Sequence, residues 1–406
     1  MAMNKKRVLG RNGYLEQANL CNQLTGWGKG EKEQVTQIRI PLDAPNIGEL
    51  EKEYVMRALD SGFVSSVGPM VAEFEERFAA YVGAPYAVAT VNGTAALHLA
   101  LRLLSIGPGD EVIVPALTFI ATANPVIYVG ATPVVVDVDP LTWDIDPAEV
   151  EKAITERTRD VISVHLYGNP ADMHRIMELA RNHGLCVVED ATEALGSTYK
   201  GRHTGTFGHI GVFSFNGNKV ITTGGGGMLV TGDPDLASRA RLLVNQGRAP
   251  GAIEYEHVEI GYNYRLTNLQ AALGLAQLER LPEFLNTKKH ISRLYRQELA
   301  NMPGITWQQE LSGVESNWWL FSILVDREKF GEDKLSIMER LRKYGIQVRP
   351  LFKPVPQQPC YKQYDIKRCP VADDLYKRGL NLPSASFLMK EDIQETCAVL
   401  LNFADY

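Results

Sequence analysis

Between residues 84 and 232, short apolar runs alternate with stretches in which apolar residues recur every three or four positions. The short runs are typical of buried strands and the longer periodic stretches of helices. We expect strands at residues 86–91, 111–115, 133–138, 161–166, 185–189, 211–215 and 228–231, and helices at 94–104, 146–154 and 172–182. Continuous apolar strands between helices predict an α/β fold with a mostly parallel central sheet flanked by helices.

The pattern changes after residue 265. Residues 267–302 are helical in period, and we expect an interruption or bend at Leu281-Pro282 because proline cannot donate its backbone hydrogen bond. Beyond it we expect a strand at 318–325, a helix at 334–344, a strand at 347–349 and a helix at 392–402. This order predicts a smaller C-terminal α+β domain.

Three regions follow from these patterns. Residues 1–37 are polar and aperiodic and form an N-terminal extension. Residues 38–265 form the large domain, with 38–80 as its N-terminal segment, and residues 266–406 form the linker helix and the small domain.

Composition narrows the class of protein. The 406 residues are 45% hydrophobic and 22% charged, which is ordinary for a soluble enzyme. The net charge of −6 disfavours nucleic acid or an anionic membrane as the main partner. The five cysteines include no C-x-x-C pair, so neither a disulfide framework nor a metal site is expected. With no signal peptide and no apolar membrane span recognised, a cytoplasmic protein is expected.

One lysine and one carboxylate stand out. Lys219 follows a predicted strand and precedes the glycine run Gly224–Gly227, and Asp190 ends an earlier strand 29 residues before that lysine. Pyridoxal 5′-phosphate (PLP) chemistry needs a lysine that binds the cofactor covalently and a carboxylate that keeps the pyridine nitrogen protonated. Either residue alone could be a solvated surface charge, but the pair favours the cofactor.

A phosphate site is predicted beside them. Asn92-Gly93-Thr94 joins a strand to a helix, and amides at a helix N-terminus bind anions. Ser214, five residues before Lys219, could add a hydroxyl to the same phosphate. The alternatives are a plain turn with Thr94 as the N-cap and a serine satisfied by backbone.

Three further residues have two interpretations each. Phe119 could stack on a pyridine ring or be an ordinary core aromatic. Glu193 could reach the cofactor's phenolic oxygen or the substrate amine, or simply complement a helix dipole. His165, at a strand end, is a candidate for substrate binding, with a satisfied core histidine as the alternative.

Taken together, these motifs resemble the sugar aminotransferases of the DegT/DnrJ/EryC1/StrS family, which are fold type I PLP enzymes. The resemblance covers about residues 38–405. Its most specific segments are residues 92–97, 115–119, 189–191, 205–208, 213–219 and 261–265.

The resemblance implies a role for each matching residue. Lys219 would bind PLP covalently, and Asp190 would pair with the ring nitrogen. Phe119 would stack on the ring, with Glu193 close by. The phosphate would be held by Gly93, Thr94 and Ser214, and by Asn263 of a second subunit, so the active unit would be a homodimer.

The resemblance also suggests a substrate. Glu193 and the run Gly224–Gly227 depart from many relatives and are similar to a LegC-like subgroup that acts on UDP-linked 4-keto-6-deoxy-N-acetylhexosamines. Residues 216–219 instead resemble perosamine synthases, which use GDP-linked sugars. The expected reaction is therefore amino transfer from L-glutamate to the C4 ketone of a UDP-linked sugar, with the GDP-linked sugar as the alternative.

Four residues are expected to contact this nucleotide sugar: His165, Asn216, Arg265 and Arg349. A PLP sugar dehydratase and a catalytically silent regulatory protein are further alternatives on the same scaffold. The dehydratases carry histidine in place of the lysine, so Lys219 argues against the first. The intact set of Lys219, Asp190 and Ser214 argues against the second.

Overall fold

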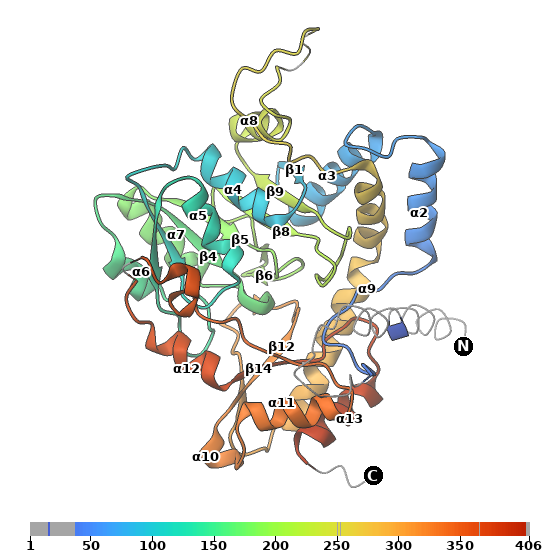
Figure 1. Cartoon of the computed structure of the whole chain (residues 1–406), viewed down its shortest axis with the longest axis vertical. Coiled ribbons are helices and arrows are strands. Elements are labelled where there is room, and N and C mark those ends of the chain that lie inside the picture. The colour runs from blue at the N-terminus through green and yellow to red at the C-terminus, as the bar shows by residue number, and fades with distance from the viewer. Residues whose placement is uncertain (1–14, 17–36, 250, 252, 365, 403–406) are drawn as a thin grey trace.

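The computed structural model describes residues 15–16, 37–249, 251, 253–364 and 366–402 (Figure 1). The predicted N-terminal extension therefore lies almost entirely outside the described residues. None of the helices in these ranges is both long and apolar enough to cross a bilayer.

A seven-stranded sheet forms the centre of the larger part of the molecule, in the order β1-β9-β8-β5-β4-β2-β3. The neighbours from β8 to β3 run parallel, and β9 is antiparallel to both of its neighbours. Its strands are β1 (Tyr86–Thr90), β2 (Glu111–Pro115), β3 (Thr132–Val136), β4 (Thr158–Val164), β5 (Cys186–Asp190), β8 (Ile210–Ser214) and β9 (Gly227–Thr231). The predicted mostly parallel sheet is confirmed.

Both faces of this sheet are buried, which explains why its strands are continuously apolar. Val161 and Val187 pack on one face with helices α6 (Pro147–Ala153) and α7 (Met173–His183). Their neighbours Ile162 and Val188 pack on the opposite face. That face is covered by α4 (Gly93–Leu103), α5 (Asn124–Tyr128) and α8 (Pro234–Val244), whereas α3 (Pro69–Val82) lies on the face of Val187, where its Phe78 ring is 5.0 Å from that of Phe213.

The smaller part contains a four-stranded antiparallel sheet in the order β10-β12-β14-β13. Its strands are β10 (Ile305–Trp307), β12 (Phe321–Val325), β13 (Arg349–Pro350) and β14 (Gly379–Leu382). Its helices are α10 (Arg327–Phe330), α11 (Lys334–Lys343), α12 (Pro370–Arg378) and α13 (Lys390–Leu400). A third sheet joins β6 (Thr198–Tyr199) to β7 (Arg202–His203) and β11 (Val314–Glu315).

Helix α9 (Asn268–Leu299) connects the two parts and begins with a capping box between Thr267 and Gln270. It continues through Pro282, so the predicted interruption is not observed. The proline is exposed, while Leu281 and Phe284 beside it are fully buried. Burial of these side chains compensates for the cost of about 3 kcal/mol that proline imposes inside a helix.

Two helices in the segment 38–80 were not predicted: α2 (Glu49–Asp60) and α3. Both pack against α9. The signal for α3 is present in the sequence, because Phe74, Phe78 and Val82 recur every fourth residue and all three are buried.

An unpaired carboxyl group lies inside the central sheet. Asp160 of β4 is fully buried, and neither of its carboxyl oxygens accepts a hydrogen bond within the described ranges. Burial disfavours the charged form and raises the pKa of Asp160 to about 7 from its ordinary 3.8.

We predict that Asp160→Asn reduces the pH dependence of stability. The unfolded carboxyl loses its proton near pH 4 and the folded one near pH 7, so the wild type loses stability as pH rises between these values. An amide cannot ionise, so the fall in Tm between pH 5 and 7 should be smaller in the variant. Parallel curves for the two proteins would contradict the assignment.

Candidate active site

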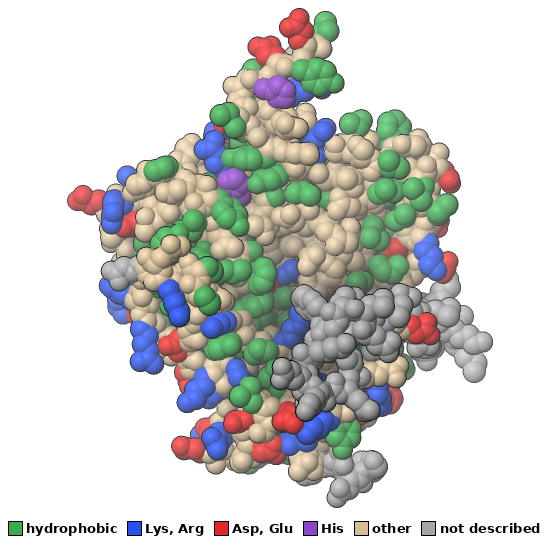
Figure 2. All heavy atoms as spheres, in the orientation of Figure 1, with side chains coloured by type: hydrophobic (Ala, Val, Ile, Leu, Met, Phe, Trp, Pro, Cys, Tyr) green, Lys and Arg blue, Asp and Glu red, His purple; other side chains and the backbone are tan. Residues whose placement is uncertain are grey.

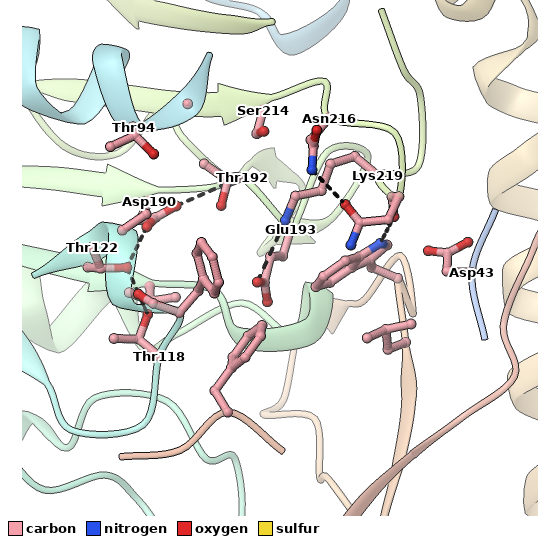
Figure 3. Close-up of a pocket in the computed structure, with 18 of the residues that line it drawn as sticks. Asp43, Thr94, Thr118, Thr122, Asp190, Thr192, Glu193, Ser214, Asn216 and Lys219 are labelled. Atoms are coloured by element: carbon pink, nitrogen blue, oxygen red, sulfur yellow. Dashed lines mark hydrogen bonds and ion pairs between the residues drawn. The ribbon is translucent and has the colours of Figure 1, made fainter. Parts of the chain in front are cut away.

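A cavity of about 480 Å³ opens where the carboxyl ends of β5 and β8 meet the N-terminus of α4. Strands β13 and β14 of the small sheet, with the residues just before β12 and just after β13, close the cavity from the other side through residues that include Trp319, Arg349, Phe352 and Asn381. Ligands of parallel α/β sheets bind at this edge. Figure 3 shows the side chains that point into it.

Asp190 ends β5 and is held at the cavity by two hydrogen bonds. Its Oδ2 accepts from the Thr122 hydroxyl at 2.8 Å, and its Oδ1 accepts from the Thr192 N–H at 3.2 Å. Thr118 lies 2.7 Å from Thr122, hydroxyl to hydroxyl, and so extends this chain (Figure 3). Both threonines line the cavity, and the sequence analysis did not single them out because nothing in the sequence indicates that they meet Asp190.

Lys219 lies on the turn after β8, where its N–H donates to the Asn216 carbonyl at 3.0 Å. Its Nζ is 3.7 Å from Glu193 Oε1 and 4.0 Å from the centroid of the Trp319 ring. The Trp319 indole donates to the Asn218 carbonyl at 2.7 Å, which fixes the ring against the turn. A carboxylate and an aromatic face therefore position the amine inside the cavity.

Glu193 is fully buried apart from the side that faces the cavity. Its Oε2 accepts from the Tyr167 N–H at 2.8 Å, and Tyr167 adopts a left-handed φ of 56° there. Burial is the main cause that raises the pKa of Glu193 to about 7, and the charge of Asp190 adds to it while Lys219 opposes it. A carboxyl with this pKa can both hold and release a proton near neutral pH.

The N-terminus of α4 forms a cradle for an anion. Asn92 caps the helix by accepting from the Ala95 N–H at 2.8 Å, and the first amides of a helix have no partner within it. A Cβ added at Gly93 would lie 3.0 Å from Ser214 Cβ and 3.2 Å from Thr192 Cγ2. The glycine therefore keeps open a space bordered by Thr94 and Ser214 (Figure 3).

These residues fit PLP. The cavity holds a lysine amine, a hydrogen-bonded carboxylate and an anion cradle, as the cofactor requires. Phe119 also lines it, with 53% of the residue exposed and its ring 5.5 Å from that of Phe352. The ring lies in the cavity wall and not in the core.

His165 does not line the cavity, so the expectation that it contacts substrate is wrong. It is fully buried, and its Nδ1 accepts from the Ala171 N–H at 3.1 Å. Its Nε2 then carries the proton and donates to Glu189 at 3.0 Å. His165 is a satisfied core histidine that holds Glu189, which itself accepts from the N–H groups of Gly205 and Gly208.

The other predicted substrate residues divide into two groups. Asn216 and Arg349 line the cavity, and Lys353, which the sequence analysis did not single out, provides a second exposed cation there. Asn263 and Arg265 do not line it. Asn263 is exposed and forms a backbone bridge with Asn245, so its predicted contact with the cofactor of a second subunit remains a prediction.

Comparisons with known proteins agree with this geometry. A model of the DegT/DnrJ/EryC1/StrS aminotransferase family matches residues 45–401. The chain is 44% identical to the GDP-perosamine synthase of Caulobacter vibrioides over 363 residues, which cover 89% of this chain and 97% of that protein. It is 43% identical to the GDP-perosamine synthase of Escherichia coli O157:H7 over 364 residues, which cover 90% and 98%.

The fold is similar to that of solved structures as well. Spr1654 from Streptococcus pneumoniae, in its PLP form, superposes with a TM-score of 0.84 at 32% identity. The match covers 89% of this chain and 98% of that one. The likeness supports both the fold type I architecture and PLP as the cofactor.

We predict that Gly93→Ala weakens PLP binding by about tenfold or more, because the new methyl group would crowd Ser214 and narrow the cradle. Titration of the apoprotein with PLP, followed by absorbance, measures the effect. Gly217→Ala is the matched control, since it lies in the loop before Lys219 and its Cβ would meet no atom within 4 Å. Equal affinities in the two variants would contradict the role of Gly93.

Proposed function

The chain belongs to the DegT/DnrJ/EryC1/StrS aminotransferase family, and on this premise we propose that it moves an amino group from L-glutamate to the C4 ketone of a GDP-linked 4-keto-6-deoxyhexose. The two GDP-perosamine synthases that it resembles favour the guanosine nucleotide over the uridine nucleotide first expected. A UDP-linked 4-keto-6-deoxy-N-acetylhexosamine is the second candidate, supported by Glu193 and the glycine run at 224–227.

The convergence of Lys219, Glu193 and Asp190 in one cavity carries the proposal. PLP, when bound, supplies a ring that accepts electrons from the substrate carbon and so lowers the barrier to proton removal. Asp190 would hold the positive charge on the ring nitrogen. Its bonds to Thr122 and Thr192 keep the carboxylate in one orientation.

Lys219 would move the proton. Its Nζ would act as a general base for the substrate carbon. Glu193, at 3.7 Å and with a pKa of about 7, can take a proton from Nζ or return one, so the amine regains its basic form. The Trp319 ring beneath Nζ limits its movement and keeps water from that side.

Substrate anions would bind at the rim. Arg349 and Lys353 are exposed cations on the small-domain side, suited to the carboxylates of the amino acid or the diphosphate of the sugar nucleotide. Asn216 can donate to the sugar. Asn263 and Arg265, which lie outside this chain's cavity, would reach the phosphates of a second subunit's site, so we propose a homodimer.

The two remaining alternatives lack support from the site. A sugar dehydratase of this scaffold would need histidine at the position of Lys219, and the lysine amine points into the cavity (Figure 3). A silent regulatory protein would not need the ordered contacts around Asp190 and Lys219.

We predict that purified protein with L-glutamate aminates a GDP-linked 4-keto-6-deoxyhexose, and that Lys219→Ala abolishes this turnover because no other amine lies at that position. Product formation is measured over a panel of GDP-, UDP- and dTDP-linked 4-keto-6-deoxy sugars. Lys200→Ala, an exposed lysine outside the cavity, is the control. Turnover of UDP sugars alone would select the second candidate, and turnover of none would refute the proposal.

We predict that the active sites are shared between subunits. Lys219→Ala and Asn263→Ala chains should each be inactive, and mixing them in equal amounts should restore about a quarter of the wild-type rate. Half of all the dimers that form after exchange contain one chain of each variant. Each of these carries one intact site out of two. No recovery, with subunit exchange shown by labelled chains, would mean that each chain completes its own site.

A further inference from the structure

The backbone around Glu193 is held by a side chain from the other part of the molecule. Residues 191–197 form neither a helix nor a strand, so the carbonyls of Glu193 and Leu195 need partners elsewhere. The side-chain amide of Asn317 supplies both, since its Nδ2 donates to each carbonyl at 2.9 Å. Asn317 is fully buried and does not line the cavity. It therefore holds Glu193 from outside the cavity.

The same amide also holds Trp319. Its Oδ1 accepts from the Trp319 N–H at 2.8 Å. The opposite orientation of the amide would place Oδ1 against two carbonyl oxygens, so the three hydrogen bonds leave only one arrangement. The indole of Trp319 is fixed in turn by its bond to the Asn218 carbonyl at 2.7 Å. One side-chain amide thus connects the backbones of Glu193 and Trp319.

The carboxyl group of Glu193 depends on Asn317 as well. Its Oε2 accepts from the Tyr167 N–H at 2.8 Å, and the next residue, Gly168, has a left-handed φ of 100°. A Cβ added at Gly168 would lie 1.9 Å from Asn317 Oδ1. The turn that carries the Tyr167 N–H therefore packs directly on the amide, and only glycine leaves room for it.

The side chains of Glu193 and Trp319 meet at Lys219. The Lys219 Nζ lies 3.7 Å from Glu193 Oε1 and 4.0 Å from the centroid of the Trp319 ring, and Figure 3 shows the first of these contacts. Direct proton transfer needs a separation of about 2.6–3.2 Å. A small shift of either neighbour therefore decides whether a proton can pass between the amine and the carboxyl group.

We propose that Asn317 is a positioning residue for proton transfer between Lys219 and Glu193. Its amide sets the separation of the Glu193 carboxyl group and the Trp319 ring, and so the place of the amine between them. In this transfer the N–H bond at Nζ breaks as an O–H bond forms at Oε1, or the reverse. The inference rests on the proposed function, in which Glu193 exchanges a proton with Lys219.

A purely structural role for Asn317 must be separated from this one. Asn317→Ala leaves the Glu193 and Leu195 carbonyls without their donor, so it lowers stability in either case. A loss of folded enzyme has the same effect with or without the Glu193 carboxyl group. A loss of position matters only while that group takes part in proton transfer, so a double-mutant cycle distinguishes the two roles.

The test uses the holoenzyme as wild type, Asn317→Ala, Glu193→Gln and the double variant. The absorbance of bound PLP follows a single turnover with L-glutamate over a range of its concentrations, and melting curves give the folded fraction. A second measurement uses the apoprotein, in which acetic anhydride labels Lys219. Mass spectrometry of the peptides compares this labelling with that of Lys200, an exposed lysine outside the cavity.

Gln308→Ala is the matched control, made alone and together with Glu193→Gln. Gln308 is also buried, and its amide also donates to two backbone carbonyls, those of Thr142 at 2.7 Å and Leu166 at 3.1 Å. Neither Gln308 nor these two residues line the cavity. The control therefore removes the same kind of buried amide without touching the neighbours of Lys219.

We expect Asn317→Ala to slow the saturated L-glutamate step by about tenfold or more, since a misplacement of about 1 Å can cost about a hundredfold. The L-glutamate concentration at half-saturation should not change. In the Glu193→Gln background the same change should slow the step by less than about threefold. Labelling of Lys219, whose side chain is 13% exposed in the wild type, should increase as its two neighbours separate. Gln308→Ala should leave the labelling unchanged and act equally in both backgrounds.

Equal effects of Asn317→Ala in the two backgrounds, or labelling of Lys219 at the wild-type level, would overturn the inference. If Asn317→Ala does not fold, as its melting curve would show, the smaller change Asn317→Ser replaces it in the same cycle and the same labelling experiment.

Failure of the proposed function is distinguishable, because it appears in the wild type before any variant is made. The test involves no sugar, so a wrong choice of nucleotide sugar leaves it intact. If L-glutamate does not react, the proposed donor is wrong, and the cycle is run with the amino acid that the wild type accepts. A wild type that accepts no amino acid would refute both the proposed function and this inference.

Discussion

The common direction of β2, β4, β5 and β8 is the constraint on which the site depends. Parallel strands end at the same edge of a sheet, so residues far apart in the chain are brought together there. Asp190 closes β5 and Ser214 closes β8, while the turn after β1 supplies Gly93. Since each strand is buried on both faces, its register cannot shift without exposing apolar side chains, which keeps these functional residues in place.

Buried charge is the second organising feature. The cavity holds Asp190, Glu193, Asp43 and the amine of Lys219 with little access to water. Burial raises the pKa of Glu193 and of Asp43, and the neighbouring lysine opposes the shift in each case. A low-polarity environment strengthens each hydrogen bond, so the bond from Thr122 helps to keep the Asp190 carboxylate in one orientation.

The small domain supplies part of the cavity wall, so the parallel sheet alone does not form the cavity. Trp319, Arg349 and Asn381 come from the small sheet or its edges, and Asp43 is held by backbone bonds to the same part. They line the cavity, and the Trp319 ring contacts the Lys219 amine. In Figure 2 this region is a hollow with basic side chains beside it, between the larger and smaller parts of the molecule. In the proposed reaction the sheet would supply the groups for proton transfer, and the small domain would supply groups that recognise the substrate.

The sequence by itself determined the seven strands, the α/β class, the long helix and the pairing of Lys219 with Asp190 in one site. Periodicity and strand ends depend on residues that are close together in the chain, so they can be recognised without the fold. It could not decide between the two interpretations of His165. Only the fold shows that this side chain points to Glu189 and Ala171, away from the cavity. Likewise Thr122, Trp319 and Asp43 meet the site through contacts across many residues of chain, and no local pattern encodes such contacts. Side-chain direction and long-range packing are properties of the folded chain, so the tertiary structure alone decided them.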